Sequence, residues 1–371
     1  MTRQKNTETA TGSERVAPGP GSPRPLLGPQ ADSTLRVHWS SSASLSGDMW
    51  SLLCCLPPRF PESDMKRRAF LHRSLAATVA TGTSRILPSA AAMSPAEAEP
   101  APAGRRIDAH VHVLDEAGPL GPFATMGQHG QLLRLMDANG VDKAIMLPYV
   151  SPRTPDNNEH CASLARQHPD RLATLTDVRL HEADATAQVA GARELHGAAG
   201  ISYYPQKPGL AWLTATDKEP LWEAYRANDL VCNLQITPED YPVVLELCQR
   251  YGDIRFVLNH LGLPGGLAAG DSNYGGLLLG AAYPNLFVKA SGFYACAAAA
   301  WDLQDARALG FLRQLVHGLG ADRILWGSDW PPVGWHLTYR QALEIVHSAA
   351  DLGEQERALI IGNNAAQVYR V

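Results

Sequence analysis

The sequence predicts a (β/α)8 barrel over residues 104–371, an α/β fold of the TIM-barrel class, and two observations lead to this prediction. Eight short β-branched or apolar runs alternate with amphipathic helical stretches in this part of the chain, which is typical of parallel β/α units. About 267 residues for eight such units is the length of one barrel domain. The alternative is a doubly wound open sheet, but the glycine fingerprint of nucleotide-binding sheets is absent after the first run.

The elements can be placed one by one. The predicted strands are Ile107–Val113, Lys143–Leu147, Leu172–Thr176, Gly200–Tyr203, Val231–Gln235, Arg255–Leu258, Leu286–Lys289 and Ile324–Trp326. Between the first two, apolar residues form one stripe over Gln128–Asn139, a helix that we expect to end at Gly140. Asp156 is the predicted N-cap of the next helix. Thr237 predicts another cap, followed by Pro238 at the first helical position.

Charge and composition limit the class of partner. The first 104 residues carry 11 Lys and Arg against 8 Asp and Glu, a balance of +3, whereas the remaining 267 carry 21 against 29, a balance of −8. An acidic barrel argues against nucleic acid as the main partner, because a phosphate-binding body should be basic. No apolar run reaches 18 residues, so no membrane span is predicted, and six Cys in 371 residues exclude a disulfide-built miniprotein. The expected partner is a small molecule, either neutral or anionic, and the oligomeric state stays open.

The first 103 residues lack the periodicity of a folded core. Residues 1–64 are rich in Ser, Pro, Gly and Thr, and we interpret them as a disordered or untranslated extension. Residues 65–103 begin Met65-Lys66-Arg67-Arg68 and continue with an apolar run and small residues, which are the three parts of an export signal. The Arg pair resembles a twin-arginine signal, which predicts export to the periplasm from a start near Met65. The alternative is a basic helix start followed by alanines.

Polar residues gather at the predicted strand ends, where barrels of this kind place their reactive groups. The first strand ends Asp108-Ala109-His110-Val111-His112, and residues two apart on a strand face the same side. His110 and His112 are therefore expected to point together into the barrel mouth. Two neutral imidazoles supply half of a first-row metal site, for example for zinc. The alternative is a pair of core histidines bonded to the backbone.

The sixth and eighth strands end in further candidates. His260 follows the strand residues Phe256-Val257-Leu258-Asn259, so it has reached the rim, where it could be a metal ligand, an acid or base, or a hydrogen-bond donor. Asp329 falls where a carboxylate can bind a metal, take a proton from water, or do both. An Asp that starts a turn before Pro is the structural alternative. We expect His260 and Asp329 to be catalytic, and His110, His112 and Asp329 to be the metal ligands.

These motifs resemble the amidohydrolase-related family of metal-dependent hydrolases. The similarity rests on His-Val-His in the first unit, Leu-Asn-His-Leu-Gly in the sixth, Val-Lys-Ala-Ser-Gly in the seventh and Trp-Gly-Ser-Asp-Trp-Pro in the eighth. More narrowly, residues 105–371 resemble the branch of sugar lactonases and pyrone-dicarboxylate lactonases. The resemblance implies a barrel hydrolase that opens a lactone or similar cyclic ester with an activated water. It also places His110, His112, His260 and Asp329 at the matching positions.

One departure from the family bears on the metal. Many metal-dependent members carry a His at the end of the fifth strand, whereas Val231–Gln235 contains none. A neutral amide is a poor zinc ligand, so the site either holds one divalent ion on a reduced ligand set or works without a metal. Decarboxylases of the family usually retain that His, so its absence favours lactone hydrolysis over non-oxidative decarboxylation. A catalytically silent ligand-binding barrel is the alternative from another class.

Five residues are predicted on the substrate side of the barrel mouth. Alternation lets only one of Tyr203 and Tyr204 point inward at the end of the fourth strand. Lys289 could neutralise a substrate carboxylate or stabilise an oxyanion, or could instead form a barrel-lining salt bridge to an Asp. The full substrate-side set is Tyr149, Tyr204, Gln235, Lys289 and Trp330.

Overall fold

The structure is a computed structural model that describes residues 104–114, 120–123, 125–205, 209–349 and 351–371. The extension predicted over residues 1–64 and the export signal predicted over residues 65–103 lie outside the described residues.

The eight predicted strand segments are confirmed as parallel strands. The third run divides at Leu175 into two short strands, so the described residues carry strands labelled β1 to β9. They are β1 (Ile107–Val111), β2 (Lys143–Met146), β3 (Leu172–Thr174), β4 (Thr176–Asp177), β5 (Gly200–Tyr203), β6 (Val231–Leu234), β7 (Phe256–Leu258), β8 (Leu286–Ala290) and β9 (Ile324–Trp326). Neighbours pair in the order β1-β2-β3 and β4-β5-β6-β7-β8-β9.

Two junctions join these two sheets into a closed cylinder. At the first, the chain passes directly from β3 into β4, and the N–H of Leu175 between them donates to the carbonyl of Met146 on β2 (2.9 Å). At the second, the N–H of His112 after β1 donates to the carbonyl of Trp330 after β9 (2.7 Å). Since β3 and β4 act as one barrel strand, the (β/α)8 prediction is confirmed.

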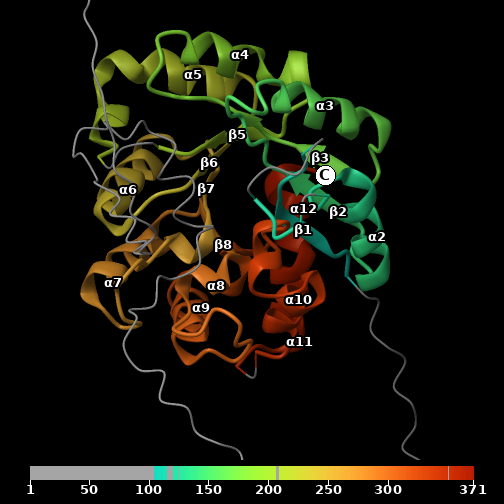
Figure 1. The fold of residues 1–371 in the computed structure, drawn as a ribbon. Helices are drawn as coiled ribbons and strands as arrows, with labels where there is room; N and C mark the ends of the chain where they lie inside the picture. The colour runs from blue at the N-terminus through green and yellow to red at the C-terminus, as the bar shows by residue number, and fades with distance from the viewer. Residues whose placement is uncertain (1–103, 115–119, 124, 206–208, 350) are drawn as a thin grey trace, which may run out of the picture. The chain divides into compact units, whose positions relative to one another are not determined.

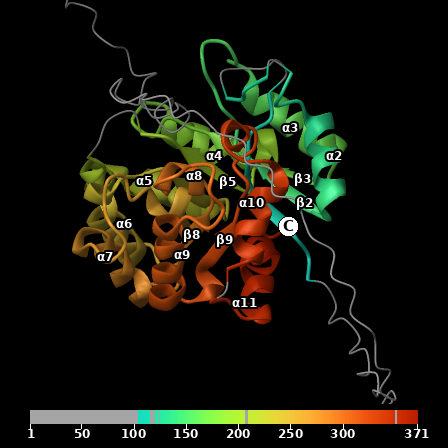
Figure 2. The ribbon, with the colours of Figure 1, turned by 60° about the horizontal axis from the view of Figure 1, so that its bottom comes forward.

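Helices surround the strands (Figures 1 and 2). They are α2 (His129–Asn139), α3 (Asn157–Gln167), α4 (Ala185–His196), α5 (Glu219–Ala227), α6 (Tyr241–Arg250), α7 (Ser272–Leu278), α8 (Phe293–Cys296), α9 (Ala306–Leu319), α10 (Tyr339–His347), α11 (Glu354–Ala358) and α12 (Asn364–Tyr369). α2 ends where predicted, because Gly140 adopts the left-handed conformation (φ 62°) and its N–H donates to carbonyls of the last turn. None of the helices described here is long and apolar enough to cross a bilayer.

Two predicted helix starts differ from the structure. Asp156 occupies the N-cap position of α3, but its side chain makes no capping hydrogen bond. After Thr237, the segment Pro238–Asp240 forms a short 3-10 turn, and α6 begins only at Tyr241. The hydroxyl of Thr237 donates to the carboxylate of Glu239 instead of capping the backbone. A neighbouring polar side chain thus displaces a cap that the sequence favours.

The barrel interior is filled by side chains, and the C-terminal helix covers its amino end. One buried cluster combines residues of the strands with residues of α12: Ile107, Ala109, Ile145, Leu147, Leu175, Val231, Val257, Leu325, Ala365, Val368 and Tyr369. Arg255, which precedes β7, donates to the carbonyl of Val368 (2.8 Å). α12 therefore covers the amino ends of the strands, whereas the carboxyl ends of the strands carry the polar residues.

Candidate active site

Two histidines lie at the end of the first strand, His110 within it and His112 directly after it, and a β-bulge aims both at one point. Between Asp108 and Val111, β1 advances three residues while its partner β2 advances two. One extra residue bends the strand and re-aims the side chains that follow it. The Nε2 atoms of His110 and His112 lie 3.3 Å apart, and both imidazoles are buried.

Asp329 closes the site from the end of β9. Its Oδ1 atom lies 3.5 Å from Nε2 of His110 and 3.5 Å from Nε2 of His112. Its Oδ2 atom lies 3.9 Å from Nε2 of His260. The backbone of Asp329 is in the left-handed region (φ 58°), which is strained for a residue with a β-carbon, and its N–H donates to the carbonyl of His110 (2.9 Å). This turn holds the carboxylate over the histidine pair.

His260 follows β7 and completes the group. Its backbone is also left-handed (φ 53°), and its N–H donates to Oγ of Ser291 (3.3 Å). Nδ1 of the same residue lies 3.0 Å from that Oγ, so Ser291 holds His260 through two contacts. The ring centroids of His260 and His110 are 4.6 Å apart. The ends of β1, β7 and β9 therefore bring three imidazoles and one carboxylate together, each residue being 6% exposed or less.

Burial and mutual contacts set the charge of the site. Burial lowers the pKa of His260 to about 4, although the Asp329 carboxylate opposes this shift, and burial holds the pKa of His110 well below its ordinary value. For Asp329, burial acts in the other direction and would raise the pKa. The charge that His260 carries when it is protonated in acid, the contact with His112 and the hydrogen bond from Tyr294 outweigh burial and lower this pKa to about 2. At neutral pH an ionised carboxylate thus lies beside the neutral imidazoles of His110 and His260.

The same atoms form a set that suits a cation. Nδ1 of His112 lies 2.8 Å from the carbonyl oxygen of Leu147, which can only accept, so Nδ1 carries a proton and neutral His112 offers the lone pair of Nε2. That lone pair faces Oδ1 of Asp329 at 3.5 Å, and two acceptors repel each other unless a cation or a proton lies between them. His110, His260 and Asp329 each present a ligand atom within 4.8 Å of the others. Zinc and related divalent ions accept such imidazole and carboxylate ligands.

Two ionisable residues, Asp108 and Lys289, are buried beside the histidine pair. Lys289 on β8 is fully buried, and its Nζ atom lies 3.5 Å from Nδ1 of His110. Oδ1 of Asp108 accepts from the N–H of His110 (3.1 Å) and from the N–H of Ser328 (2.8 Å), which ties β1 to the chain after β9. Burial raises the pKa of Asp108 to about 6 and holds the pKa of Lys289 well below its ordinary value. Lys289 is thus placed against His110 inside the barrel, and its contact with a substrate stays a prediction.

The other substrate-side candidates lie at strand ends, where alternation turns the two tyrosines in opposite directions. Tyr204 packs against the cluster inside the barrel, whereas Tyr203 belongs to the cluster between the strands and the helices. Tyr149 after β2 and Gln235 after β6 are half-buried. Trp330 is only 1% exposed, and its backbone closes the barrel, so its side chain is part of the core. Contacts of this set with a substrate stay predictions.

Two residues of the site, Ser291 and Tyr294, escape prediction from the sequence. Ser291 lies two residues after Lys289, and residues two apart on a strand face the same side. The alternation of the strand could therefore have predicted that Ser291 points into the barrel with Lys289. Tyr294 donates its hydroxyl to Oδ2 of Asp329 (2.6 Å). It lies on α8, behind the left-handed residue Gly292, so no strand period indicates where its side chain points.

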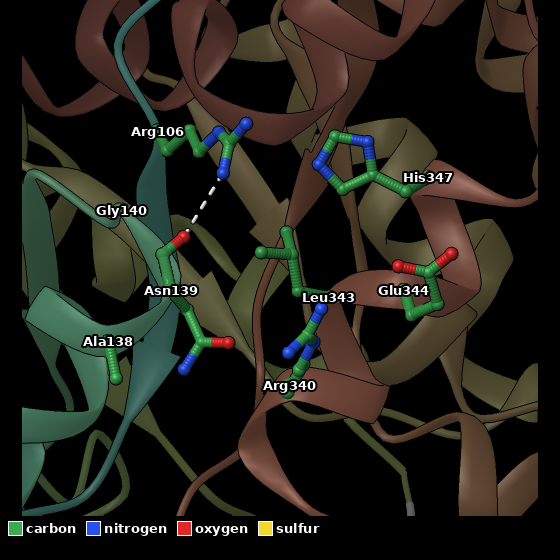
Figure 3. Close-up of a pocket in the computed structure, with 8 residues that line it drawn as sticks. All are labelled: Arg106, Ala138, Asn139, Gly140, Arg340, Leu343, Glu344 and His347. Atoms are coloured by element: carbon green, nitrogen blue, oxygen red, sulfur yellow. Dashed lines mark hydrogen bonds between the residues drawn. The ribbon is translucent and has the colours of Figure 1, made fainter.

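A separate cavity of about 550 Å³ lies near the amino ends of β1 and β2 (Figure 3). Its lining comes from the end of α2, from α10 and from the residue before β1: Arg106, Ala138, Asn139, Gly140, Arg340, Leu343, Glu344 and His347. Arg106 donates to the carbonyl of Asn139 (3.0 Å). Since barrels of this kind react at the carboxyl ends of their strands, this cavity is not the candidate active site.

Comparison with known proteins agrees with the geometry. Residues 107–371 match the sequence profile of the amidohydrolase family. A curated relative, the L-fucono-1,5-lactonase of Burkholderia ambifaria, is 29% identical over 284 residues, which cover 72% of this chain and 96% of the relative. Two crystal structures share the fold, each with a TM-score of 0.60 and 22% identity over 72% of this chain. They are an amidohydrolase from Burkholderia multivorans with bound zinc, matched over 99% of its length, and a candidate 2-pyrone-4,6-dicarboxylic acid hydrolase from Pseudomonas putida, matched over 97%.

Proposed function

The chain belongs to the amidohydrolase family, and on this premise we propose that it is a lactonase that opens a small cyclic ester by adding water. The curated relative named as an L-fucono-1,5-lactonase supports the lactone of a sugar acid as substrate. The observation that carries the proposal is the convergence of one ionised carboxylate with three buried imidazoles at the ends of β1, β7 and β9. Such a group can activate water and steady charge that develops on a carbonyl oxygen.

Asp329 acts first as general base and then as general acid. Its pKa of about 2 keeps the carboxylate ionised at neutral pH, so it can accept a proton from the attacking water. The water oxygen bonds to the carbonyl carbon of the lactone, and the bond from that carbon to the ring oxygen then breaks. Asp329 returns its proton to the ring oxygen, which leaves as a hydroxyl group. The hydroxy acid formed releases one proton to the solvent.

The histidines hold the carboxylate and supply ligand atoms. His110 and His112 lie against one oxygen of Asp329, and His260 lies against the other. His110, His260 and Asp329 would hold a divalent ion such as zinc, with Nε2 of His112 3.3 Å from that of His110. When bound, the ion would polarise the carbonyl and lower the pKa of a water toward neutrality.

Acid release from a panel of lactones tests the proposal. Purified protein is assayed with a pH indicator on neutral sugar lactones and on 2-pyrone-4,6-dicarboxylate, beside the Asp329→Asn variant. We expect one proton per lactone opened and a large loss of rate in the variant. Carbon dioxide released from an aromatic acid would identify a decarboxylase instead, and binding without turnover would identify a silent barrel. Elemental analysis before and after dialysis against a chelator shows whether the activity follows zinc.

A further inference from the structure

Tyr294 contacts the carboxylate of Asp329 at the oxygen that does not face the histidine pair. Its hydroxyl donates to Oδ2 (2.6 Å), whereas Oδ1 lies 3.5 Å from Nε2 of both His110 and His112. Tyr294 is 6% exposed and Asp329 is 2% exposed, so this hydrogen bond is sheltered from solvent. The two oxygens of Asp329 therefore have different partners.

Two features hold the phenol ring in place. Gly292 turns the chain at the end of β8 (φ 58°), and α8 begins close to His260, where a β-carbon on Gly292 would lie 2.5 Å from Nδ1 of that histidine. The ring of Tyr294 also stacks on His336, with centroids 4.8 Å apart and 21° between the planes. His336 belongs to the segment after β9, which carries Asp329 as well. The hydroxyl of Tyr294 is thus positioned both by the turn after β8 and by the segment after β9.

The loop that follows α8 is fixed by charged side chains. Oδ2 of Asp305 accepts from the N–H groups of Ala298 and Ala299 (3.0 Å each). Arg307 donates to the carbonyl of Cys296 at the end of α8 and to the carbonyl of Leu267 (2.8 Å) in the loop after β7. The C-terminal end of α8 is therefore fixed, which limits the freedom of Tyr294 to leave the carboxylate.

We propose that Tyr294 is a positioning residue for Asp329, which occupies Oδ2 and thereby leaves Oδ1 to exchange the proton with the attacking water. A carboxylate that is free to rotate presents either oxygen, so a hydrogen bond that selects one orientation increases the fraction of molecules ready to react. The inference deepens the proposed lactonase function and rests on it, because it assigns Tyr294 to the proton transfer by Asp329.

Tyr294→Phe tests the role, since it removes the hydroxyl and keeps the ring that stacks on His336. We expect kcat to fall about 10- to 100-fold, the usual effect of losing a partner that orients a functional group, with KM nearly unchanged. The matched control is Tyr251→Phe, because Tyr251 is 2% exposed and its hydroxyl also donates to a carboxylate, that of Glu219 (2.8 Å), on the outer helices. The control should keep the wild-type kcat. A rise of KM at unchanged kcat, or a kcat within about two-fold of wild type, overturns the proposal.

A double-mutant cycle separates action through Asp329 from a general effect on packing. In the Asp329→Asn background, the added Tyr294→Phe substitution should leave the residual rate unchanged, because the group that Tyr294 positions no longer exchanges a proton. A loss of the same size in both backgrounds would show that the hydroxyl acts independently of Asp329, and the proposal would be wrong.

Crystal structures of the wild type and of Tyr294→Phe give a readout that needs no activity. A carboxylate of Asp329 that rotates in the variant supports the positioning role, and an unchanged orientation overturns it. If the wild type opens no lactone of the panel, the proposed function fails by itself, and this comparison still decides whether Tyr294 orients Asp329.

Discussion

At the scale of single residues, the site depends on a carboxylate that is charged although it is almost completely buried. Burying an isolated carboxylate is costly, and proteins normally neutralise it by raising its pKa. Asp329 escapes this because Tyr294 donates to one oxygen and the imidazoles surround both. The result is a charge that is available to substrate and sheltered from bulk water, a setting in which electrostatic interactions are strong.

The substitution Asp329→Asn should abolish most turnover and leave the fold intact. Asn has nearly the same shape, accepts the hydrogen bond from Tyr294, and tolerates the left-handed backbone at this position (φ 58°). It cannot take up a proton, so kcat should fall by the ~10²–10⁴-fold typical of losing a general acid or base. Steady-state kinetics with circular dichroism as the folding control measures this. Retention of more than about a tenth of the wild-type rate would mean that another group handles the proton.

Asp177, at the end of β4, is a further carboxylate near the site, and its titration should be visible in stability rather than in rate. Burial raises its pKa from 3.8 to about 7, against the opposing hydrogen bond from Val150 and the charge of Arg179. The folded protein therefore binds this proton more tightly than the unfolded chain, so its contribution to the free energy of unfolding is largest below pH 3.8 and is lost as pH rises to about 7.

The Asp177→Asn variant does not titrate, so its stability relative to wild type should increase across that pH window. The increase is at most about 4 kcal/mol, since one pKa unit corresponds to about 1.4 kcal/mol. Urea unfolding of both proteins between pH 4 and pH 8 measures the difference. Curves that stay parallel over the whole range would contradict the assignment, and a large loss of kcat would make Asp177 a competing base.

At the scale of elements, irregular backbone at the strand ends builds the site. β1 is bulged before His112, and the residues after β7, β8 and β9 that approach one another, His260, Gly292 and Asp329, all have positive φ. Left-handed residues turn the chain sharply where a strand would otherwise continue. Strain of this kind persists when the surrounding structure over-determines it, and it concentrates at functional sites. The regular strands therefore support one bulge and three left-handed turns, which orient the side chains of the site.

Gly292→Ala should damage the site more than its backbone strain alone requires. A β-carbon in the left-handed region costs about 1–2 kcal/mol, and here it would also press on His260, 2.5 Å from Nδ1. Gly197→Ala is the matched control, because Gly197 has φ 63° and a β-carbon there would meet no atom within 4 Å. We expect the control to lose stability only and to keep kcat, whereas Gly292→Ala should lose more stability and at least about tenfold in kcat. Equal effects of the two substitutions on kcat and stability would refute this.

At the scale of the whole molecule, the two ends of the closed barrel have different roles: the amino end is packed for stability, and the carboxyl end carries the reactive side chains. α12 covers the amino end, where Arg255 holds its backbone, and the carboxyl ends of the strands bring the reactive side chains together. Eight β/α units are needed for this, because the histidine pair comes from the first and Asp329 follows the last. The barrel closes where the N–H of His112 donates to the carbonyl of Trp330 and the N–H of Asp329 donates to the carbonyl of His110, so the hydrogen bonds that close the barrel also bring the histidine pair next to Asp329.

Export is a property that the barrel does not determine, and it should depend on the arginine pair upstream. We propose that Arg67 and Arg68 belong to a twin-arginine signal, whose receptor reads arginine and not positive charge alone. Replacing both with Lys should keep the protein in the cytoplasm of a bacterial host, whereas Arg85→Lys, within the same segment but outside the pair, should leave export unchanged. Fractionation followed by immunoblotting measures the distribution. Unchanged export of the double variant would rule out this signal.

Much of this architecture could be predicted from the sequence. Strand and helix periods are local properties of the backbone, so the runs from Ile107 to Trp326 could be assigned to alternating elements, and eight units imply a barrel. A barrel gathers the carboxyl ends of its strands, so His110, His112, His260 and Asp329 could be assigned to one end of the molecule. This assignment needed only the position of each residue within its strand and the place of that strand in the order of β/α units.

Only the tertiary structure decided which atoms touch. Lys289 lies against His110, Thr237 binds Glu239 in place of a helix start, and Tyr294 donates to Asp329. These contacts depend on a bulge, on left-handed turns and on the stagger between distant strands. A left-handed residue with a β-carbon costs about 1–2 kcal/mol, which is comparable to the roughly 1 kcal/mol that a local preference such as a helix cap contributes. No periodic pattern in the sequence predicts these contacts, because they form between side chains that become neighbours only when the barrel closes.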